Sequence, residues 1–144
     1  MRIEIHMVEG AIDLVAQAWD AEGAGAVVCF KGMVRDWEQG KAGRIAIAGL
    51  HYEVYEGMAR RQLKRLAEEA LEKYRLLMIK VVHSRGFVSA GKCSFCLHMA
   101  GVHREETLAA MEWFIDAMKQ DVPIWKQAVA GDVVLVEEVQ GGRA

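Results

Sequence analysis

One stretch near the C-terminal end constrains the fold most, because it couples an amphipathic helix to the only proline of the chain. Residues 103–126 read HREETLAAMEWFIDAMKQDVPIWK. Apolar side chains recur there at intervals of three and four residues: Leu108, Met111, Ile115 and Met118. This spacing predicts one helix from Arg104 to Lys119, with its apolar stripe turned toward a core. Pro123 lacks a backbone N–H, so the chain has to continue from there in another conformation.

Cationic side chains stand at both ends of this predicted helix and on the extension beyond it. His103 and Arg104 begin it, Lys119 ends it, and Lys126 follows. Positive charge on a packed frame favours an anionic substrate. A straight helix separates Arg104 from Lys119 by about 22 Å, so these two residues either serve separate sites or meet across a two-fold dimer. As purely structural residues, Arg104 starts the helix and Lys119 stabilises its C-terminal end through the helix dipole.

Lys126 has two interpretations that the residues alone leave open. Pro123 restricts the backbone, and Ile124 and Trp125 are large apolar neighbours that favour packing. A lysine held there loses proton affinity when it is desolvated, and it then serves as an acid, a base or a nucleophile. A lysine beside a buried tryptophan can instead extend its amine to solvent.

The rest of the chain predicts one α+β domain over residues 1–144, because strand and helix patterns follow one another without repeats or linkers. We expect about three helices packed on a mixed or antiparallel sheet. The helices are expected at Glu9–Asp20, Glu56–Tyr74 and Arg104–Lys119, and the strands at Arg2–Val8, Ala26–Val34, Arg44–Val54, Leu76–His83, Lys92–Ala100 and Asp132–Val139. The polar, glycine-rich segment Asp36–Gly43 is interpreted as a mobile loop. Gly32, inside an apolar strand, indicates a bulge or a close backbone approach.

Composition narrows the function classes. The net charge of −2 argues against general nucleic-acid binding, which needs a broad basic surface. No apolar run is long enough to span a membrane, and the acidic first strand does not resemble a signal peptide, so we expect a cytoplasmic protein. No phosphate-binding loop, nucleophile elbow or carboxylate pair appears in the sequence, and no cofactor is expected.

The three cysteines are expected to be free thiols, because nothing marks the chain for secretion. Cys93 and Cys96 have Cys-x-x-Cys spacing, but they lie in a predicted strand, where positions three apart point to opposite faces. One such pair without a second is a poor zinc site, so buried thiols are the preferred interpretation and no metal is expected. His83, at a strand end, is either catalytic or a hydrogen-bonded core residue. The remaining strand histidines are scattered without metal-ligand spacing: His6, His51 and His98.

Several motifs in register carry a resemblance to a known family. They are Gly25-Ala26 leading to Phe30-x-Gly32-x-Val34-Arg35; Leu50-x-Tyr52-Glu53-x-Tyr55-x-x-Met58-Ala59; His83; Gly91; His103-Arg104; and Ile115-Asp116-x-x-Lys119 through Val122-Pro123-Ile124-Trp125-Lys126. Over residues 24 to 126 the sequence resembles the large, catalytic subunits of molybdopterin synthase.

The resemblance implies a fold, a reaction and an assembly. The fold is α/β-hammerhead-like. In the reaction, a sulfurtransferase moves sulfur from the C-terminal thiocarboxylate of a small ubiquitin-like partner, which ends in Gly-Gly, to cyclic pyranopterin monophosphate. Two transfers build the dithiolene that later holds molybdenum. The assembly is a homodimer of large subunits with one small subunit at each end, which makes a heterotetramer.

The resemblance also implies roles for individual residues. Lys119 and Lys126 are the expected catalytic residues. Arg35, His103 and Arg104 are expected to bind the pterin phosphate. The channel for the tail of the partner is expected to be lined by four further residues: Phe30, Met111, Pro123 and Trp125.

The chain departs from the family pattern at three places. Ala128 stands where the family usually has a glutamate, Ser84 follows His83 where the family has arginine, and the closing strand GDVVLVEEV has no tryptophan. These departures keep a second hypothesis open, that of a diverged, non-catalytic module that binds a Gly-Gly-terminated tail. The presence of both Lys119 and Lys126 argues against it, because binding a tail does not require a lysine with shifted proton affinity.

Overall fold

The computed structural model describes residues 2–15, 20–131 and 133–139, the last range by its backbone alone. Two α-helices and nine β-strands follow one another along this part of the chain. Their bounds are β1 (Arg2–Glu9), β2 (Ala26–Met33), β3 (Trp37–Gly40), β4 (Gly43–Ala46), β5 (Gly49–Val54), α1 (Glu56–Lys73), β6 (Leu76–Ser89), β7 (Cys93–Gly101), α2 (Arg104–Asp121), β8 (Ile124–Ala130) and β9 (Val133–Val139). The mixture of helices with a mostly antiparallel sheet confirms the predicted α+β class.

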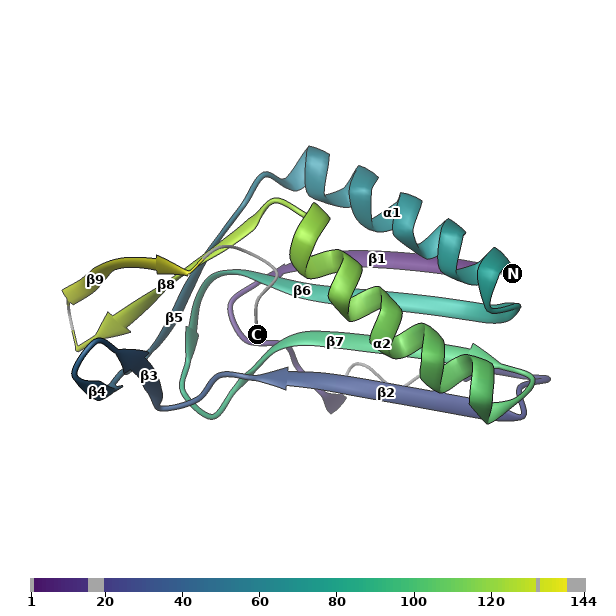
Figure 1. Ribbon diagram of the computed structural model, residues 1–144, viewed down its shortest axis with the longest axis horizontal. Coiled ribbons are helices and arrows are strands. Elements are labelled where there is room, and N and C mark those ends of the chain that lie inside the picture. The colour runs from purple at the N-terminus through teal and green to yellow at the C-terminus, as the bar shows by residue number, and fades with distance from the viewer. Residues whose placement is uncertain (1, 16–19, 132, 140–144) are drawn as a thin grey trace.

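Both helices lie on one face of the sheet (Figure 1). The sheet has seven strands in the order β2-β7-β6-β5-β8-β9, with β1 paired to β6, while β3 and β4 form a separate hairpin. Only β1 and β6 pair in parallel; the other described pairs are antiparallel. α1 packs on β1 and β6, and α2 packs on β2 and β7. Figure 1 shows α2 running from the end of β7 to the start of β8, so its C-terminal end approaches the second half of the sheet.

β6 joins the two halves of the sheet. Its first half pairs with β7, and its residues 86–89 pair with β5. Between these segments Gly86 has a φ of 75°, a left-handed conformation that glycine adopts without steric cost. Arg85 forms ion pairs with Glu9 of β1 (3.2 Å) and Glu56 of α1 (3.4 Å). The first strand and the first helix are therefore tied to the point where the sheet changes partners.

The apolar faces of the two helices form the main core with the sheet. In α1 every apolar position that the sequence predicts is buried except Tyr74, which follows the helix and is half-buried. The buried residues of α1 are Ala59, Leu63, Leu66, Ala67, Ala70 and Leu71. Its basic residues lie on the exposed face and pair with acidic neighbours along the helix, for example Arg60 with Glu56 at 3.1 Å, so the solvated-face interpretation is confirmed.

The predicted stripe of α2 is only partly right. Met111 and Met118 are buried, but Leu108 is 54% exposed and Ile115 is half-buried. The face toward the sheet is instead centred on fully buried Phe114. It includes small residues that let the helix approach closely, and its members are Thr107, Ala110, Met111, Phe114 and Met118.

Two segments around the hairpin differ from the sequence prediction. The glycine-rich segment Asp36–Gly43, predicted as a mobile loop, contains β3 and the turn into β4. The single strand predicted over Arg44–Val54 is two strands, because the chain bends at Ile47 and Ala48. The N–H groups of these two residues donate to carbonyls of the β2–β3 connection and of β8, at 2.9 and 2.6 Å. Bonds outside the ladder thus end one strand and begin the next.

The first part of the helix predicted over Glu9–Asp20 is not formed. Glu9 ends β1, residues 10–14 have no helical structure, and residues 16–19 lie outside the described part of the chain. The Ile12 N–H donates to the carbonyl of Cys93 (2.9 Å), and the Ile12 side chain packs against Val82 and Cys96. Pairing with the sheet surface therefore overrides the helical spacing of the apolar residues.

β6 continues six residues beyond the end predicted at His83, through most of the segment predicted as a connection to the next strand, and β8 was not predicted as a strand. The other predicted elements are confirmed within a few residues at their ends. The bulge expected at Gly32 is also present, because the register between β2 and β7 shifts between Gly32 and Met33. Neither described helix combines the length and the apolar character that crossing a membrane requires.

Gly101 ends β7, two residues separate it from α2, and a side chain at this position has no room. A Cβ at this position would clash with Thr107 Oγ1 and would lie 3.2 Å from Leu76 Cδ2. The Thr107 hydroxyl donates to the His103 carbonyl (2.7 Å) in the first turn of α2, so the clash affects the start of that helix. We expect Gly101→Ala to lower the free energy of unfolding by about 2 kcal/mol, measured by urea denaturation.

Gly57→Ala is the matched control. Gly57 lies in the first turn of α1, where the nearest atom to an added Cβ is an Arg61 guanidinium nitrogen at 3.6 Å. Alanine there should raise the free energy of unfolding by about 0.5 kcal/mol, because the unfolded chain loses conformational freedom. Equal effects of the two substitutions would contradict the close packing at Gly101.

Candidate functional site

Lys126 is a buried lysine in the middle of β8. Side chains alternate along this strand, so Ile124, Lys126 and Ala128 are buried while Trp125 and Gln127 lie half-buried on the other face. Only 5% of the Lys126 surface is exposed. A buried ammonium group is unfavourable unless other groups compensate it, so such a position points to function.

A narrow pocket opens at Lys126. It is lined by Gly32, Met33, Arg35, Glu38, Leu50, Tyr52, His83, Ser94, Phe95, Met118 and Lys126. These residues come from both halves of the sheet, from the hairpin and from the C-terminal end of α2. The cavity measures about 40 Å³, room for about three water molecules.

Burial, and after it the charged neighbours, set the proton affinity of Lys126. Burial lowers the pKa of its amine; the charge of Glu38 opposes this shift, and the charges of Arg35 and Lys119 add to it. Cations therefore outnumber carboxylates among these four groups, which favours an anionic ligand. The amine also releases its proton more readily than that of an exposed lysine, as proton transfer or nucleophilic attack requires.

Aromatic and hydroxyl groups form the wall of the pocket beside Lys126. The Tyr52 hydroxyl donates to Ser94 Oγ (2.8 Å), and burial raises the pKa of Tyr52. The Tyr52 ring meets the His83 imidazole edge to face, with ring centroids 5.3 Å apart. His83 donates its Nδ1–H to the Ser84 carbonyl (2.7 Å), which leaves Nε2 as the acceptor. His83 is thus a hydrogen-bonded buried residue that also lines the pocket.

The hairpin brings a carboxylate to the pocket that sequence reasoning missed. Glu38 of β3 is the one acidic side chain among the described lining residues. Beside it, the Arg35 and Arg44 guanidinium groups lie 4.5 and 3.8 Å from the ring centre of Trp37, a cation–π arrangement that holds the hairpin against the strand end. The sequence did carry a signal for this hairpin, because side chains alternate in character on either side of a Gly-Lys-Ala-Gly turn. The glycine-rich composition of the segment favoured a loop instead, and the prediction followed it.

The structure brings some of the predicted cationic residues together and leaves others apart. Arg35 and Lys126 line the pocket, and Lys119, half-buried in the last turn of α2, is near enough to act on the charge of Lys126. His103 and Arg104 lie exposed at the other end of α2, with Arg104 about 22 Å from Lys119 along the axis. One chain therefore does not unite the two groups.

The four residues predicted to line a channel are spread over the molecule. Phe30 lies beside the pocket, because its ring is 5.9 Å from that of Phe95. Met111 is buried in the main core, and Pro123 is half-buried just before β8. Trp125 lies on the face of β8 opposite to Lys126, where its ring meets that of Tyr55 at 5.0 Å. Of the four, the structure places only Phe30 next to the pocket.

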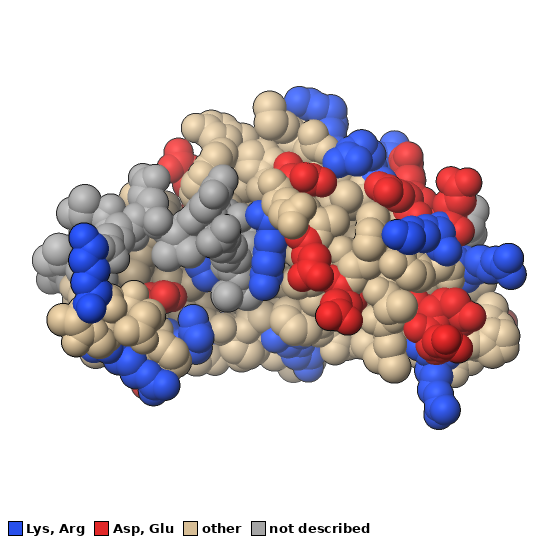
Figure 2. Space-filling model, viewed as in Figure 1, with Lys and Arg blue, Asp and Glu red and all other residues tan. Residues whose placement is uncertain are grey.

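Surface charge differs between the two ends of the helix-bearing face (Figure 2). Acidic and basic side chains lie interleaved over the helices, on the right of the view. On the left, around the hairpin, the visible charged side chains are mostly basic. This distribution is consistent with an anionic ligand at the pocket end of the molecule.

Known proteins resemble this chain over most of its length. Residues 5–121 match the family described as MoaE protein. The molybdopterin synthase catalytic subunit of Oryza sativa subsp. indica is 38% identical over 109 residues, 76% of this chain and 54% of that protein, so the chain spans about half the length of this relative. The same subunit of Thermoplasma volcanium is 36% identical over 106 residues, 74% of each chain. A solved complex of subunits 1 and 2 of molybdopterin-converting factor from Helicobacter pylori contains a chain that superposes with a TM-score of 0.77 at 26% identity, covering 91% of this chain and 88% of that one.

The pH dependence of stability should report the burial of His83. Burial lowers the pKa of His83 from 6.5 to about 4, with the Ser84 hydrogen bond opposing this shift and Lys126 adding to it. Between these two values the unfolded chain binds a proton that the folded chain does not, so stability falls as pH falls through this window. This group should remove roughly 2 kcal/mol between about pH 7 and about pH 5.

His83→Gln tests this prediction by removing the titrating group. Urea denaturation at both pH values should show a smaller loss of stability in His83→Gln than in the wild type. The comparison uses the slope with pH, so a constant destabilisation by the substitution does not affect it. Equal slopes in the two proteins would contradict a buried, neutral His83.

Proposed function

Because the chain belongs to the MoaE protein family, we propose that it catalyses sulfur transfer as the catalytic subunit of a molybdopterin synthase. The proposed donor is the C-terminal thiocarboxylate of a small ubiquitin-like partner that ends in Gly-Gly. The proposed acceptor is cyclic pyranopterin monophosphate, and two transfers build the dithiolene of molybdopterin. The names of the relatives from rice and Thermoplasma volcanium support this assignment.

The observation that carries this proposal is the buried amine of Lys126 at a narrow pocket. A Gly-Gly tail has no side chains, so its end suits a narrow pocket. The thiocarboxylate is an anion, and Lys126, Arg35 and Lys119 supply the opposite charge. We place the pterin at the mouth of the pocket, beside exposed Arg35.

Lys126 and Lys119 act in this proposal on the charge that moves during the transfer. When water replaces the sulfur on the acyl carbon and leaves the tail as a carboxylate, negative charge shifts between the sulfur, the acyl oxygen and the pterin. A fixed cation aimed at that charge acts mainly in the transition state. The lowered pKa of Lys126 also lets its amine exchange a proton in the same step, while Glu38 works against permanent loss of that proton.

A homodimer within a heterotetramer completes the proposed site. His103 and Arg104 are exposed at the end of α2 that lies away from the pocket. A two-fold axis can bring that end of one protomer to the pocket of the other, where the pair would bind the pterin phosphate. The two-subunit complex from Helicobacter pylori supports a small partner subunit. We propose the cytoplasm as the compartment, in keeping with three free cysteines.

Burial of Lys126 disfavours the alternative of a non-catalytic module that only binds a tail. Such a module gains nothing from a desolvated lysine, which lowers stability. Ala128, at the position of the family's glutamate, is buried on the same face of β8 as Lys126. Glu38 of the hairpin supplies a carboxylate near Lys126 from another element, so the local charge balance does not depend on position 128.

Lys126 should matter far more for the chemical step than for partner binding. We expect Lys126→Ala to lower single-turnover sulfur transfer about a hundredfold or more, while the affinity for the thiocarboxylated partner changes only a few-fold. The tail is bound by many contacts, of which one amine is a small part. Quenched-flow turnover and calorimetric titration of the partner measure the two quantities.

Lys126→Arg separates charge from proton transfer, because a guanidinium keeps the charge but does not give up its proton. We expect this variant to lose activity as Lys126→Ala does. Lys64→Ala, at an exposed position on α1, is the control and should keep wild-type turnover. Normal turnover in Lys126→Ala would remove this residue from the catalytic assignment.

Mixed dimers should reveal a site shared between protomers. Arg104→Ala and Lys119→Ala homodimers should each be inactive, because every site lacks one residue. In a dimer of one chain of each kind, both substitutions fall in the same site. The other site takes Lys119 and Arg104 from the chains that still carry them, so mixing should restore part of the activity. Differently tagged chains and tandem purification isolate the hybrid. An inactive hybrid, once its composition is verified, would argue against a shared site.

A further inference from the structure

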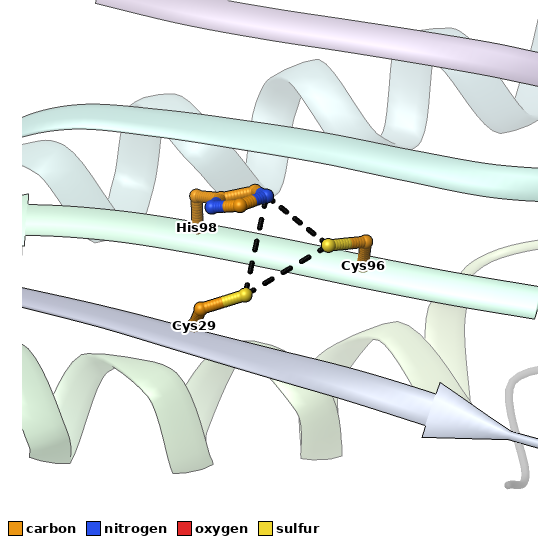
Figure 3. A group of neighbouring side chains, drawn as sticks. All are labelled: Cys29, Cys96 and His98. Carbon is orange, nitrogen blue, oxygen red and sulfur yellow. Dashed lines mark hydrogen bonds between the residues drawn. The ribbon is translucent and has the colours of Figure 1, made fainter. Parts of the chain in front are cut away.

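Three side chains with metal-binding atoms meet on a part of the sheet that the sulfur-transfer pocket does not use. Cys29 lies in β2, and Cys96 and His98 lie two residues apart in β7. Cys29 is directly opposite His98 in the antiparallel ladder, which makes Cys96 its diagonal neighbour on the same face. Figure 3 shows the two sulfur atoms and the imidazole turned toward one another across the two strands.

This cluster faces away from the main core under the helices. Phe95 and Leu97 of β7 belong to that core, whereas Cys96 packs in a separate small cluster with Ile12, Val82 and Cys93. Successive residues of a strand point to opposite faces. Phe95 thus lines the pocket of Lys126, and the neighbouring Cys96 points to the other side of the sheet.

The distances within the cluster match those between ligands of a tetrahedral zinc ion. The two Sγ atoms are 3.8 Å apart, and His98 Nε2 lies 4.0 Å from Cys29 Sγ and 3.1 Å from Cys96 Sγ. Zinc–sulfur bonds of about 2.3 Å and zinc–nitrogen bonds of about 2.0 Å in tetrahedral geometry place ligand atoms roughly 3.5 to 3.8 Å apart. Only shifts of a few tenths of an ångström separate the observed triangle from that arrangement.

Burial favours the neutral forms of both His98 and Cys96 when no metal is bound. His98 and Cys96 are buried, and burial lowers the pKa of His98, which favours the neutral form that binds metals. Burial also raises the pKa of Cys96 to about 12, with Cys29 adding to the shift and Lys31 opposing it. A metal that binds at Cys96 therefore has to displace the thiol proton, so binding should strengthen as pH rises.

We propose that Cys29, Cys96 and His98 form a binding site for Zn²⁺, with the fourth coordination position left to water or another external donor. Soft sulfur ligands with one imidazole select zinc over the hard cations that prefer oxygen. The ion would link β2 to β7 on the face of the sheet away from the helices. This site is separate from the proposed sulfur-transfer chemistry and does not depend on it.

Cys93 provides an internal contrast. It completes the Cys-x-x-Cys spacing with Cys96, yet it is not part of the group formed by Cys29, Cys96 and His98. Its thiol donates to the Phe95 carbonyl at 3.2 Å. Cys93 is buried like Cys96, so its replacement tests the effect of losing a buried thiol without losing a proposed ligand.

Metal titration of the full-length protein tests the proposal directly. The protein is stripped with a chelator under reducing conditions and titrated with Zn²⁺ in competition with a chromophoric chelator. We expect one ion per chain. With Co²⁺ as the probe, we expect thiolate-to-metal charge-transfer absorption and the intense visible bands of tetrahedral cobalt. Binding well below one ion per chain, or a cobalt spectrum without the charge-transfer band, would overturn the proposal.

Substitutions assign the ligands. Cys29→Ser and His98→Gln should each weaken Zn²⁺ binding by at least about 100-fold, since even changes outside the direct ligands cost 10- to 100-fold. Cys93→Ser should stay within a few-fold of the wild type. Zn²⁺ should raise the melting temperature of the wild type and of Cys93→Ser but not of Cys29→Ser. Cys29 is exposed, so its variant should fold, and unchanged affinity in it would refute the site.

Discussion

The change of partners along β6 is the constraint on which the rest of the structure depends. The strand pairs with β7 over its first half and with β5 after Gly86, whose φ of 75° suits glycine. A Cβ at Gly86 would also meet the carboxylate of Glu9. Because the two half-sheets meet here, His83 from one half comes beside Tyr52 of the other, and β8 then brings Lys126 to the same seam.

Burial of Lys126 lowers the free energy of unfolding, but it gives the site an amine with a lowered pKa. The amine is desolvated and lies near Arg35 and Lys119, which both disfavour its charged form. Glu38 is the group that opposes them, and it stands on a hairpin that lies outside the main sheet. The proton affinity of Lys126 therefore depends on how the hairpin is held, and the Trp37 ring between two guanidinium groups helps to hold it.

Sequence patterns predicted the elements that have long, regular periods, and they failed where tertiary contacts decide. The eighteen-residue helix α1 and its buried face follow from spacing alone. The exposure of Leu108 does not, because the face of α2 that meets the sheet is chosen by the packing of Phe114. The glycine-rich composition around Glu38 predicted a loop, so the position of Glu38 at the pocket was missed. The irregular chain around Ile12 was missed because it depends on a hydrogen bond to β7. For the site, Lys119 and Lys126 stood out as cations in the sequence, and the resemblance supplied their catalytic roles and the binding role of Arg35. The Tyr52–Ser94 hydrogen bond could not be predicted without the strand order.

The cysteine and histidine cluster shows why ligand spacing along a sequence is an incomplete guide to metal sites in sheets. Cys29 and His98 are sixty-nine positions apart, and only the pairing of β2 with β7 makes them neighbours. A slip of one residue in that register would turn Cys29 to the helix side and separate it from both partners. The bulge between Gly32 and Met33 lies beyond the cluster, toward the pocket end of β2, so it alters the register there while Cys29 stays opposite His98. Successive residues of β7 thus present Phe95 to the pocket and Cys96 to the opposite face.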